Sequence, residues 1–186
     1  MKYVSLVLLI ALSACSPKTY RTGDYSYYRK QFRLADSSFL RTDGVYIAAA
    51  VWTDDNPTLR APKEKKILQF FPGGQTNLFL DMGDSLKTEA DFIGKIAARH
   101  KEQGATLFEG YYRIEGDRIA IQRVNNPLRQ FNYAFGHIAQ DSIVILKGGI
   151  EGRQPFADKN YPGIYKEYYI FMPLDTAELH KYPAYW

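Results

Sequence analysis

From Phe39 onward, apolar and polar residues alternate in short stretches, and each stretch ends at turn-forming residues. This period of two predicts β-strands, because successive side chains of a strand point to opposite faces of the sheet. The stretches are 44–52, 66–71, 75–80, 107–114, 118–124, 130–138, 141–147 and 166–172. Pro72-Gly73-Gly74 and Glu115-Gly116-Asp117 each join two stretches, which predicts two hairpins.

One segment between the third and fourth predicted strands has a helical period instead. Phe92, Ile93, Ile96 and Ala97 form an apolar stripe at helical spacing. Thr88-Glu89-Ala90-Asp91 resembles a capping box with Asp in place of Glu or Gln, and Gly104 is the expected end. His100 falls in the last turn, where a partly charged imidazole interacts favourably with the helix C-terminus.

Sequential antiparallel strands with one half-buried face each predict a mainly β fold. The prediction is an eight-stranded antiparallel barrel with one helix between strands 3 and 4, since closure removes exposed strand edges. A two-sheet sandwich is the alternative. Eight strands leave an interior just wide enough for side chains or one small ligand.

An aromatic face on the predicted strand 130–138 is the candidate ligand-binding site. Phe131, Tyr133 and Phe135 alternate with smaller residues and therefore share one face. An aromatic wall with a few polar groups suits a small-molecule pocket. Ordinary core packing is the other role that such a stripe can have.

The N-terminus has the pattern of an export signal. Lys2 precedes an apolar run from Val4 to Leu12, which is too short for a bilayer span of about 20 residues. Its length is typical of a signal-peptide core, so residues 1–14 are predicted to be a signal peptide. In that case this segment forms a helix or coil that does not pack into the barrel.

Leu12-Ser13-Ala14-Cys15 resembles the lipobox of bacterial lipoproteins. The resemblance implies cleavage before Cys15, a diacylglyceryl thioether on its sulfur and an acylated amino terminus, which together anchor the chain to a membrane. Ser16 stands where an inner-membrane retention Asp would be in enteric bacteria, which favours the outer membrane. Residues 16–19 lack the acidic run of surface-exposed lipoproteins, which favours a domain facing the periplasm.

The predicted organisation has three parts: signal peptide 1–14, lipidated Cys15 with a tether over 15–38, and one barrel domain over 39–186. The tether is polar, with four Tyr among Arg, Lys, Ser and Asp, and without a sustained period. It is expected to be a linker that could pack partly on the domain. A strip that binds a protein partner is the alternative.

Three segments carry a second resemblance: Leu40 to Tyr46, Gln69 to Gly74 and Glu109 to Asp117. They resemble small lipocalin-like lipoproteins of the Bacteroidetes type, over roughly residues 39–172. The chain differs from lipocalins in having Gly44-Val45-Tyr46 in place of Gly-x-Trp on the first strand. It also has its helix in the middle of the chain, whereas lipocalins carry theirs after the last strand.

Charge, aromatic content and cysteine content narrow the possible folds and functions. The formal charge of +4 is spread along the chain without a basic run, so no nucleic-acid binding is expected. An aromatic content of 15% favours sheet over helix. The only cysteine is Cys15, which leaves neither an internal disulfide nor a thiol nucleophile once it is lipidated.

The sequence contains no recognisable catalytic or metal-binding motif. His100, His137 and His180 are far apart and lack metal-ligand spacing. There is no Gly-x-Ser-x-Gly elbow, and the glycines of 148–152 lack the Lys-Ser/Thr pair of a phosphate loop. Asp54-Asp55-Asn56 fits a turn better than a calcium loop. We therefore expect no cofactor, no metal and no enzymatic activity.

Two functions remain after these exclusions. The leading hypothesis is a lipid-anchored envelope protein whose barrel binds a small apolar ligand or lipid. The alternative is an envelope protein-interaction module that has a filled barrel and uses its tether and the loops 53–65 and 148–165. Whether the barrel interior is open or filled separates the two.

Overall fold

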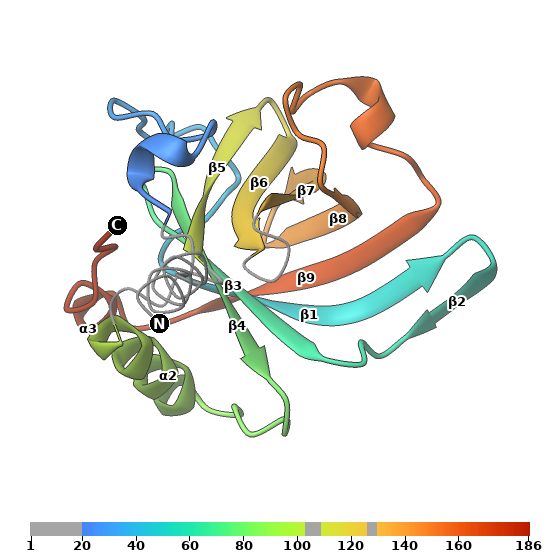
Figure 1. Cartoon of the computed structure of the whole chain (residues 1–186). Coiled ribbons are helices and arrows are strands. Elements are labelled where there is room, and N and C mark those ends of the chain that lie inside the picture. Colours follow the sequence, from blue (N-terminus) through green and yellow to red (C-terminus); the bar gives the residue numbers. More distant parts are fainter. Residues whose placement is uncertain (1–19, 103–108, 126–129) are drawn as a thin grey trace, which may run out of the picture.

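A computed structural model describes residues 20–102, 109–125 and 130–186 of the chain (Figure 1). Eight strands form a closed antiparallel barrel, and a further strand, β2, pairs beside β1. The strands are β1 (Gly44–Thr53), β2 (Asn56–Arg60), β3 (Lys65–Phe70), β4 (Gln75–Asp81), β5 (Glu109–Glu115), β6 (Arg118–Asn125), β7 (Gln130–Ala139), β8 (Ser142–Gly149) and β9 (Tyr165–Pro173). The helical elements are η1 (Thr22–Asp24), α2 (Glu89–Lys101), η3 (Asp158–Asn160) and α3 (Thr176–Leu179). The predicted eight-stranded barrel, with a helix between its third and fourth strands, is confirmed.

The barrel closes through β1 and β9. Their pairing runs from Gly44 opposite Pro173 to Thr53 opposite Tyr165, with a bulge between Ala48 and Ala50. β3 pairs only with the first part of β1, and β2 takes its place beside the second part. This closure identifies the fold as a barrel, because the sheets of a two-sheet sandwich are not joined edge to edge.

β2 is the strand that the sequence pattern missed. Its residues were expected to form a loop, because Asn56 and Pro57 favour turns. Pro57 lacks a backbone N–H, which a strand tolerates at a sheet edge. All five residues of β2 are exposed, so it has no buried face whose alternation could have revealed it.

Aromatic side chains fill one half of the barrel interior. Tyr46, Phe70 and Tyr112 are fully buried and pack edge to face, with ring centres 5.7 Å apart for Tyr46–Phe70 and 5.2 Å apart for Phe70–Tyr112. Leucine and isoleucine side chains from β3, β6, β7 and β8 surround them: Leu68, Ile119, Ile121, Ile138, Ile143 and Ile145. This half is therefore solid core.

Residues 32–41 close this end of the barrel. Phe32 and Leu34 pack against the interior cluster, and the Leu34 N–H donates to the Pro72 carbonyl at 3.0 Å. The Arg41 guanidinium lies 4.1 Å from the centre of the Phe171 ring and forms ion pairs with Asp43 at 2.5 Å and Asp141 at 3.0 Å. The closed end thus combines apolar packing with an ion-pair network.

The segment before the closed end lies on the outer surface of the barrel, beside β5 and β6 (Figure 1). Tyr20, Tyr25 and Tyr27 are buried there. The Tyr27 hydroxyl donates to the Gly152 carbonyl at 3.0 Å, and its N–H donates to the Gln122 side chain at 2.8 Å. The folded part of the chain therefore begins no later than Tyr20, inside the segment that was expected to be a tether.

Helix α2 covers another side of the barrel. Thr88 and Asp91 form the expected capping box, in which the Asp91 carboxylate accepts from the Thr88 N–H at 2.7 Å. Phe92 and Ile96 are buried against Val45 and neighbouring apolar residues of β3 and β4. The helix ends at Lys101, and Gly104 lies outside the described residues.

The short helix α3 was not predicted. The Asp175 carboxylate accepts from the Ala177 N–H at 2.8 Å and thereby caps it. Asp175 followed by Glu178 has the spacing of a helix start, which is the signal that could have revealed it. Leu179 of this helix is buried in the same cluster as Phe92.

The interior cluster predicts a large effect for Phe70→Ala. Phe70 is 1% exposed and contacts two other buried aromatic rings. The variant is expected to lose about 3–5 kcal/mol of unfolding free energy in urea, because the cavity cannot collapse within a closed barrel. The control is Ile170→Thr on β9, which is exposed and should change stability by no more than about 0.5 kcal/mol. Equal losses in both variants would contradict this account of the core.

Candidate functional site

The half of the barrel away from residues 32–41 contains a cavity of about 850 Å³. Inward-facing residues of β3, β4 and β6–β9 line it, and the segment 148–165 provides its rim. The lining includes Lys66, Leu78, Arg123, Ala134, Ile145, Leu146, Lys147, Lys159, Tyr165, Glu167 and Tyr169. The barrel interior is therefore filled at one end and open at the other.

Small inward-facing residues leave this space. Asn132 and Ala134 of β7 and Gly148 of β8, which pairs with Ala134, stand at positions where the other half of the barrel has aromatic rings or isoleucines. A register shift between β7 and β8 leaves Leu146 without a paired residue, so both Ile145 and Leu146 line the cavity. The walls are largely apolar as a result.

Two exposed isoleucines extend the apolar surface to the rim. Ile150 and Ile164 are 57% and 63% exposed and both border the cavity. Single exposed apolar residues are ordinary, but two beside an opening with apolar walls form one continuous surface. A ligand with an apolar body can contact this surface as it enters.

Charged side chains from β3 and β9 meet inside the open half. The Lys66 ammonium lies 3.0 Å from a carboxylate oxygen of Glu167, and the Glu167 side chain is only 6% exposed. Burial and the nearby Glu167 charge raise the pKa of Tyr165 to about 12. Lys66 therefore neutralises the one carboxylate among the described residues that line the cavity.

Arg123 of β6 brings a further positive charge to this cavity. Its Nε–H makes no hydrogen bond, and no carboxylate of the described residues lies within ion-pair distance of its guanidinium. Burial lowers the pKa of Arg123, but an arginine pKa starts so high that the side chain stays protonated. The cavity therefore contains a positive charge that no neighbouring group neutralises.

The aromatic residues predicted to bind ligand lie on the other face of β7. Phe131 packs edge to face on Tyr20 at 5.0 Å between ring centres, and Tyr133 packs on Tyr27 at 5.5 Å. Phe135 is fully buried against the same outer cluster. Phe131 and Tyr133 hold the N-terminal segment on the barrel, whereas Phe135 packs against Tyr161 with ring centres 6.0 Å apart. Tyr133 alone of the three also borders the cavity.

The pattern of β7 could not show which face is inside. Both faces are covered, one by the barrel interior and the other by residues 20–28 and the loop 150–161. Alternation identifies two faces but not which of them points inward when both are buried. The wall expected from Phe131, Tyr133 and Phe135 is formed instead by residues that sequence reasoning did not select, among them Arg123, Ile145 and Glu167.

The other residues considered for chemistry are dispersed. Cys15 lies outside the described residues, so its lipidation remains a prediction. His100 packs against the rings of Tyr182 and Tyr185, and His137 Nδ1 lies 2.8 Å from Asp117. Within the part of the chain that the structure describes, no three His, Cys, Asp or Glu side chains are grouped for a metal ion.

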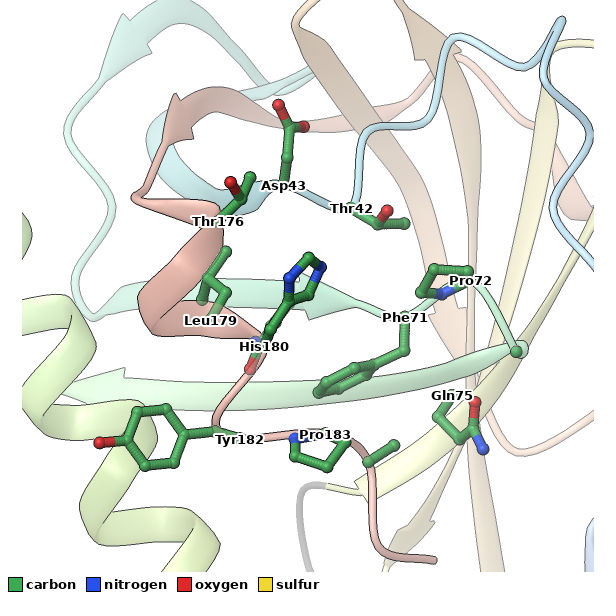
Figure 2. A pocket seen from close by; sticks show the side chains of 13 residues that line it. Thr42, Asp43, Phe71, Pro72, Gln75, Thr176, Leu179, His180, Tyr182 and Pro183 are labelled. Carbon is green, nitrogen blue, oxygen red and sulfur yellow. The ribbon is translucent and has the colours of Figure 1, made fainter.

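A second pocket of about 360 Å³ lies between the β3–β4 turn and the C-terminal segment. Figure 2 shows His180 projecting into it between Asp43 and Phe71. The Asp43 carboxylate is already paired with Arg41, which lowers the pKa of Asp43. This pocket is smaller than the barrel cavity and, among the described residues, presents no unpaired buried charge, so the barrel cavity is the stronger candidate.

The C-terminal residues cover a buried carboxylate beside this second pocket. Glu109 of β5 is 2% exposed and accepts hydrogen bonds from Arg99 at 3.2 Å and from the Tyr185 hydroxyl. Trp186 Nε1 donates to the Gly110 carbonyl at 3.2 Å. Burial nevertheless raises the pKa of Glu109 above its usual value. These contacts fasten the C-terminus to the barrel.

Comparison with known proteins returns no matching family model, no matching curated protein and no matching solved structure. Over residues 20–102, 109–125 and 130–186, no helix has the length and apolar character needed to cross a bilayer.

The Glu109 environment predicts a pH dependence of stability. A carboxyl group whose pKa is raised on folding stabilises the fold below its unfolded value, and this contribution is lost as pH rises through the folded value. The stability of the unaltered chain relative to Glu109→Gln should therefore fall as pH rises above about 4.5. Urea unfolding of both proteins across this range measures the difference. The prediction is contradicted if the unaltered chain becomes more stable relative to Glu109→Gln as pH rises.

Proposed function

We propose that this protein is a lipid-anchored component of a bacterial cell envelope whose barrel binds a small ligand with an apolar body. The observation that carries the proposal is the cavity of about 850 Å³ in the open half of the barrel. Ligand pockets typically measure about 300–1,000 Å³ and have apolar walls with a few placed polar groups. Leu78, Ala134 and Ile145 supply such walls, and Lys66, Arg123 and Glu167 supply the polar groups.

The cavity favours ligand binding over the alternative of a protein-interaction module with a filled barrel. Closing the barrel does not require an open half, since aromatic rings fill the other half completely. An open apolar space reduces packing and therefore stability. A ligand that occupies the space restores those contacts.

The predicted anchor fits a site that receives its ligand at a membrane. Four residues separate Cys15 from Tyr20, so lipid on Cys15 holds Tyr20 within about 18 Å of the membrane surface. Tyr20 packs on Phe131, and Phe131 precedes the cavity residue Asn132 on β7. A lipid on Cys15 therefore keeps the open end of the barrel close to the membrane.

Ala134→Leu tests whether the cavity binds ligand. The larger side chain enters the cavity and should weaken binding of the neutral fluorescent probe N-phenyl-1-naphthylamine by about tenfold, because it takes up part of the ligand's space. A fluorescence titration measures the dissociation constant. The matched control is Ala139→Leu, the same change at an exposed position of β7.

The proposal fails if the unaltered protein does not bind the probe, or if the Ala134 and Ala139 variants bind it equally. Mass spectrometry of an organic extract of the protein purified from envelope membranes provides an independent test. A small amphiphile recovered from the unaltered protein and depleted from Ala134→Leu supports the same conclusion.

Cys15→Ser tests the anchor. Without a thiol no thioether lipid can form, so the variant should lose metabolic palmitate label and leave the membrane fraction of an expressing bacterium. Ser16→Ala is the control and should keep both label and fractionation. Palmitate label retained by Cys15→Ser would refute lipidation at Cys15.

A further inference from the structure

We infer that the ligand of the barrel cavity carries an anionic head group, a carboxylate or a phosphate, that binds the Arg123 guanidinium inside the barrel. This inference rests on the proposed ligand-binding function and adds the chemical class of the ligand.

The charge of Arg123 is unpaired among the described residues. A buried charge is costly unless it is paired and hydrogen-bonded. Lysine can escape this cost by losing its proton, but arginine cannot. Arg123 lines the cavity with no ion-pair partner among the described residues and with its Nε–H unsatisfied. The fold therefore retains an unfavourable charge that a bound anion would neutralise.

The Glu167 carboxylate, which lines the same cavity, is already paired with Lys66. Glu167 lies close enough to act on Arg123 electrostatically, but its oxygens are bound by the Lys66 ammonium at 3.0 and 3.3 Å. Both oxygens of the Glu167 carboxylate thus lie beside the Lys66 ammonium of β3. It leaves Arg123 available to an anion that enters from outside.

Positive charge predominates in the cavity as a whole. Its described lining contains four cationic side chains, Lys66, Arg123, Lys147 and Lys159, against the single carboxylate of Glu167. A cleft lined by one sign of charge attracts ligands of the opposite sign. Leu78, Ile145 and Leu146 line the same cavity, so the site suits an anionic amphiphile better than a small inorganic anion.

The test uses the full chain and displacement of bound N-phenyl-1-naphthylamine by three ligands with the same alkyl chain. Dodecanoate carries a carboxylate, dodecyl phosphate carries a phosphate and dodecanol is neutral. The anion that the site recognises should displace the probe at a concentration at least about tenfold lower than dodecanol does. The two anionic arms distinguish a carboxylate site from a phosphate site.

Arg123→Met removes the charge and keeps the apolar length of the side chain. It should weaken binding of the preferred anion by about 30-fold or more and leave dodecanol unchanged. Arg153→Met is the matched control, since Arg153 is exposed on the 148–165 segment and does not line the cavity. Arg123→Lys keeps the charge without the planar guanidinium, so it should preserve the preference for the anion over dodecanol.

Stability gives a second readout that is independent of the probe. Without ligand, Arg123→Met should unfold at a higher urea concentration than the unaltered chain, because the half-buried charge and its unsatisfied Nε–H are gone. Added dodecanoate or dodecyl phosphate should stabilise the unaltered chain but not Arg123→Met.

The outcomes separate the two proposals. Failure of the neutral probe to bind overturns the proposed function and this inference with it. Probe binding with equal displacement by anions and dodecanol overturns the anionic head group alone, as does unchanged anion affinity in Arg123→Met. If Arg123→Met does not fold, Arg123→Gln, which also removes the charge, takes its place, and an anion preference retained in that folded variant overturns the assignment to Arg123.

Discussion

Closure of the sheet between β1 and β9 is the constraint on which the rest of the structure depends. Pairing from Gly44 opposite Pro173 to Thr53 opposite Tyr165 joins the first and last strands of the barrel, which leaves β2 with an unpaired edge among the described strands. Only after this pairing does the sheet have an enclosed interior. The aromatic core, the cavity and the meeting of Lys66 with Glu167 all require it.

The barrel interior is asymmetric because residue size changes along the strands. Near the closed end, β1, β3 and β5 contribute Tyr46, Phe70 and Tyr112, which fill the space between them. Towards the open end, β7 contributes Asn132 and Ala134, which are too small to do so. Stability is thus concentrated at one end, and the other end is left available for binding.

Much of the barrel was predictable because interactions between residues close together in sequence determine its strands, turns and helix cap. Alternation within β5 puts Tyr112 and Tyr111 on opposite faces, and in the structure Tyr112 lies inside the barrel and Tyr111 outside. The turn at Pro72-Gly73-Gly74 forms as expected, with Gly74 at φ +92°, a conformation that glycine adopts without steric cost. Thr88 and Asp91 cap α2 through neighbouring backbone groups. Each of these features depends on residues close together in sequence.

The sequence by itself determined the eight barrel strands and the two faces of each, since these follow from backbone geometry and short-range contacts. Only the tertiary structure decided which face of β7 points inward, because covering segments bury Phe131 and Phe135 from outside. It also decided that Lys66, Arg123 and Glu167, from three separate strands, line one cavity. In the sequence each is an ordinary polar residue of a strand, and their common site exists only because the closed barrel brings distant strands to one end.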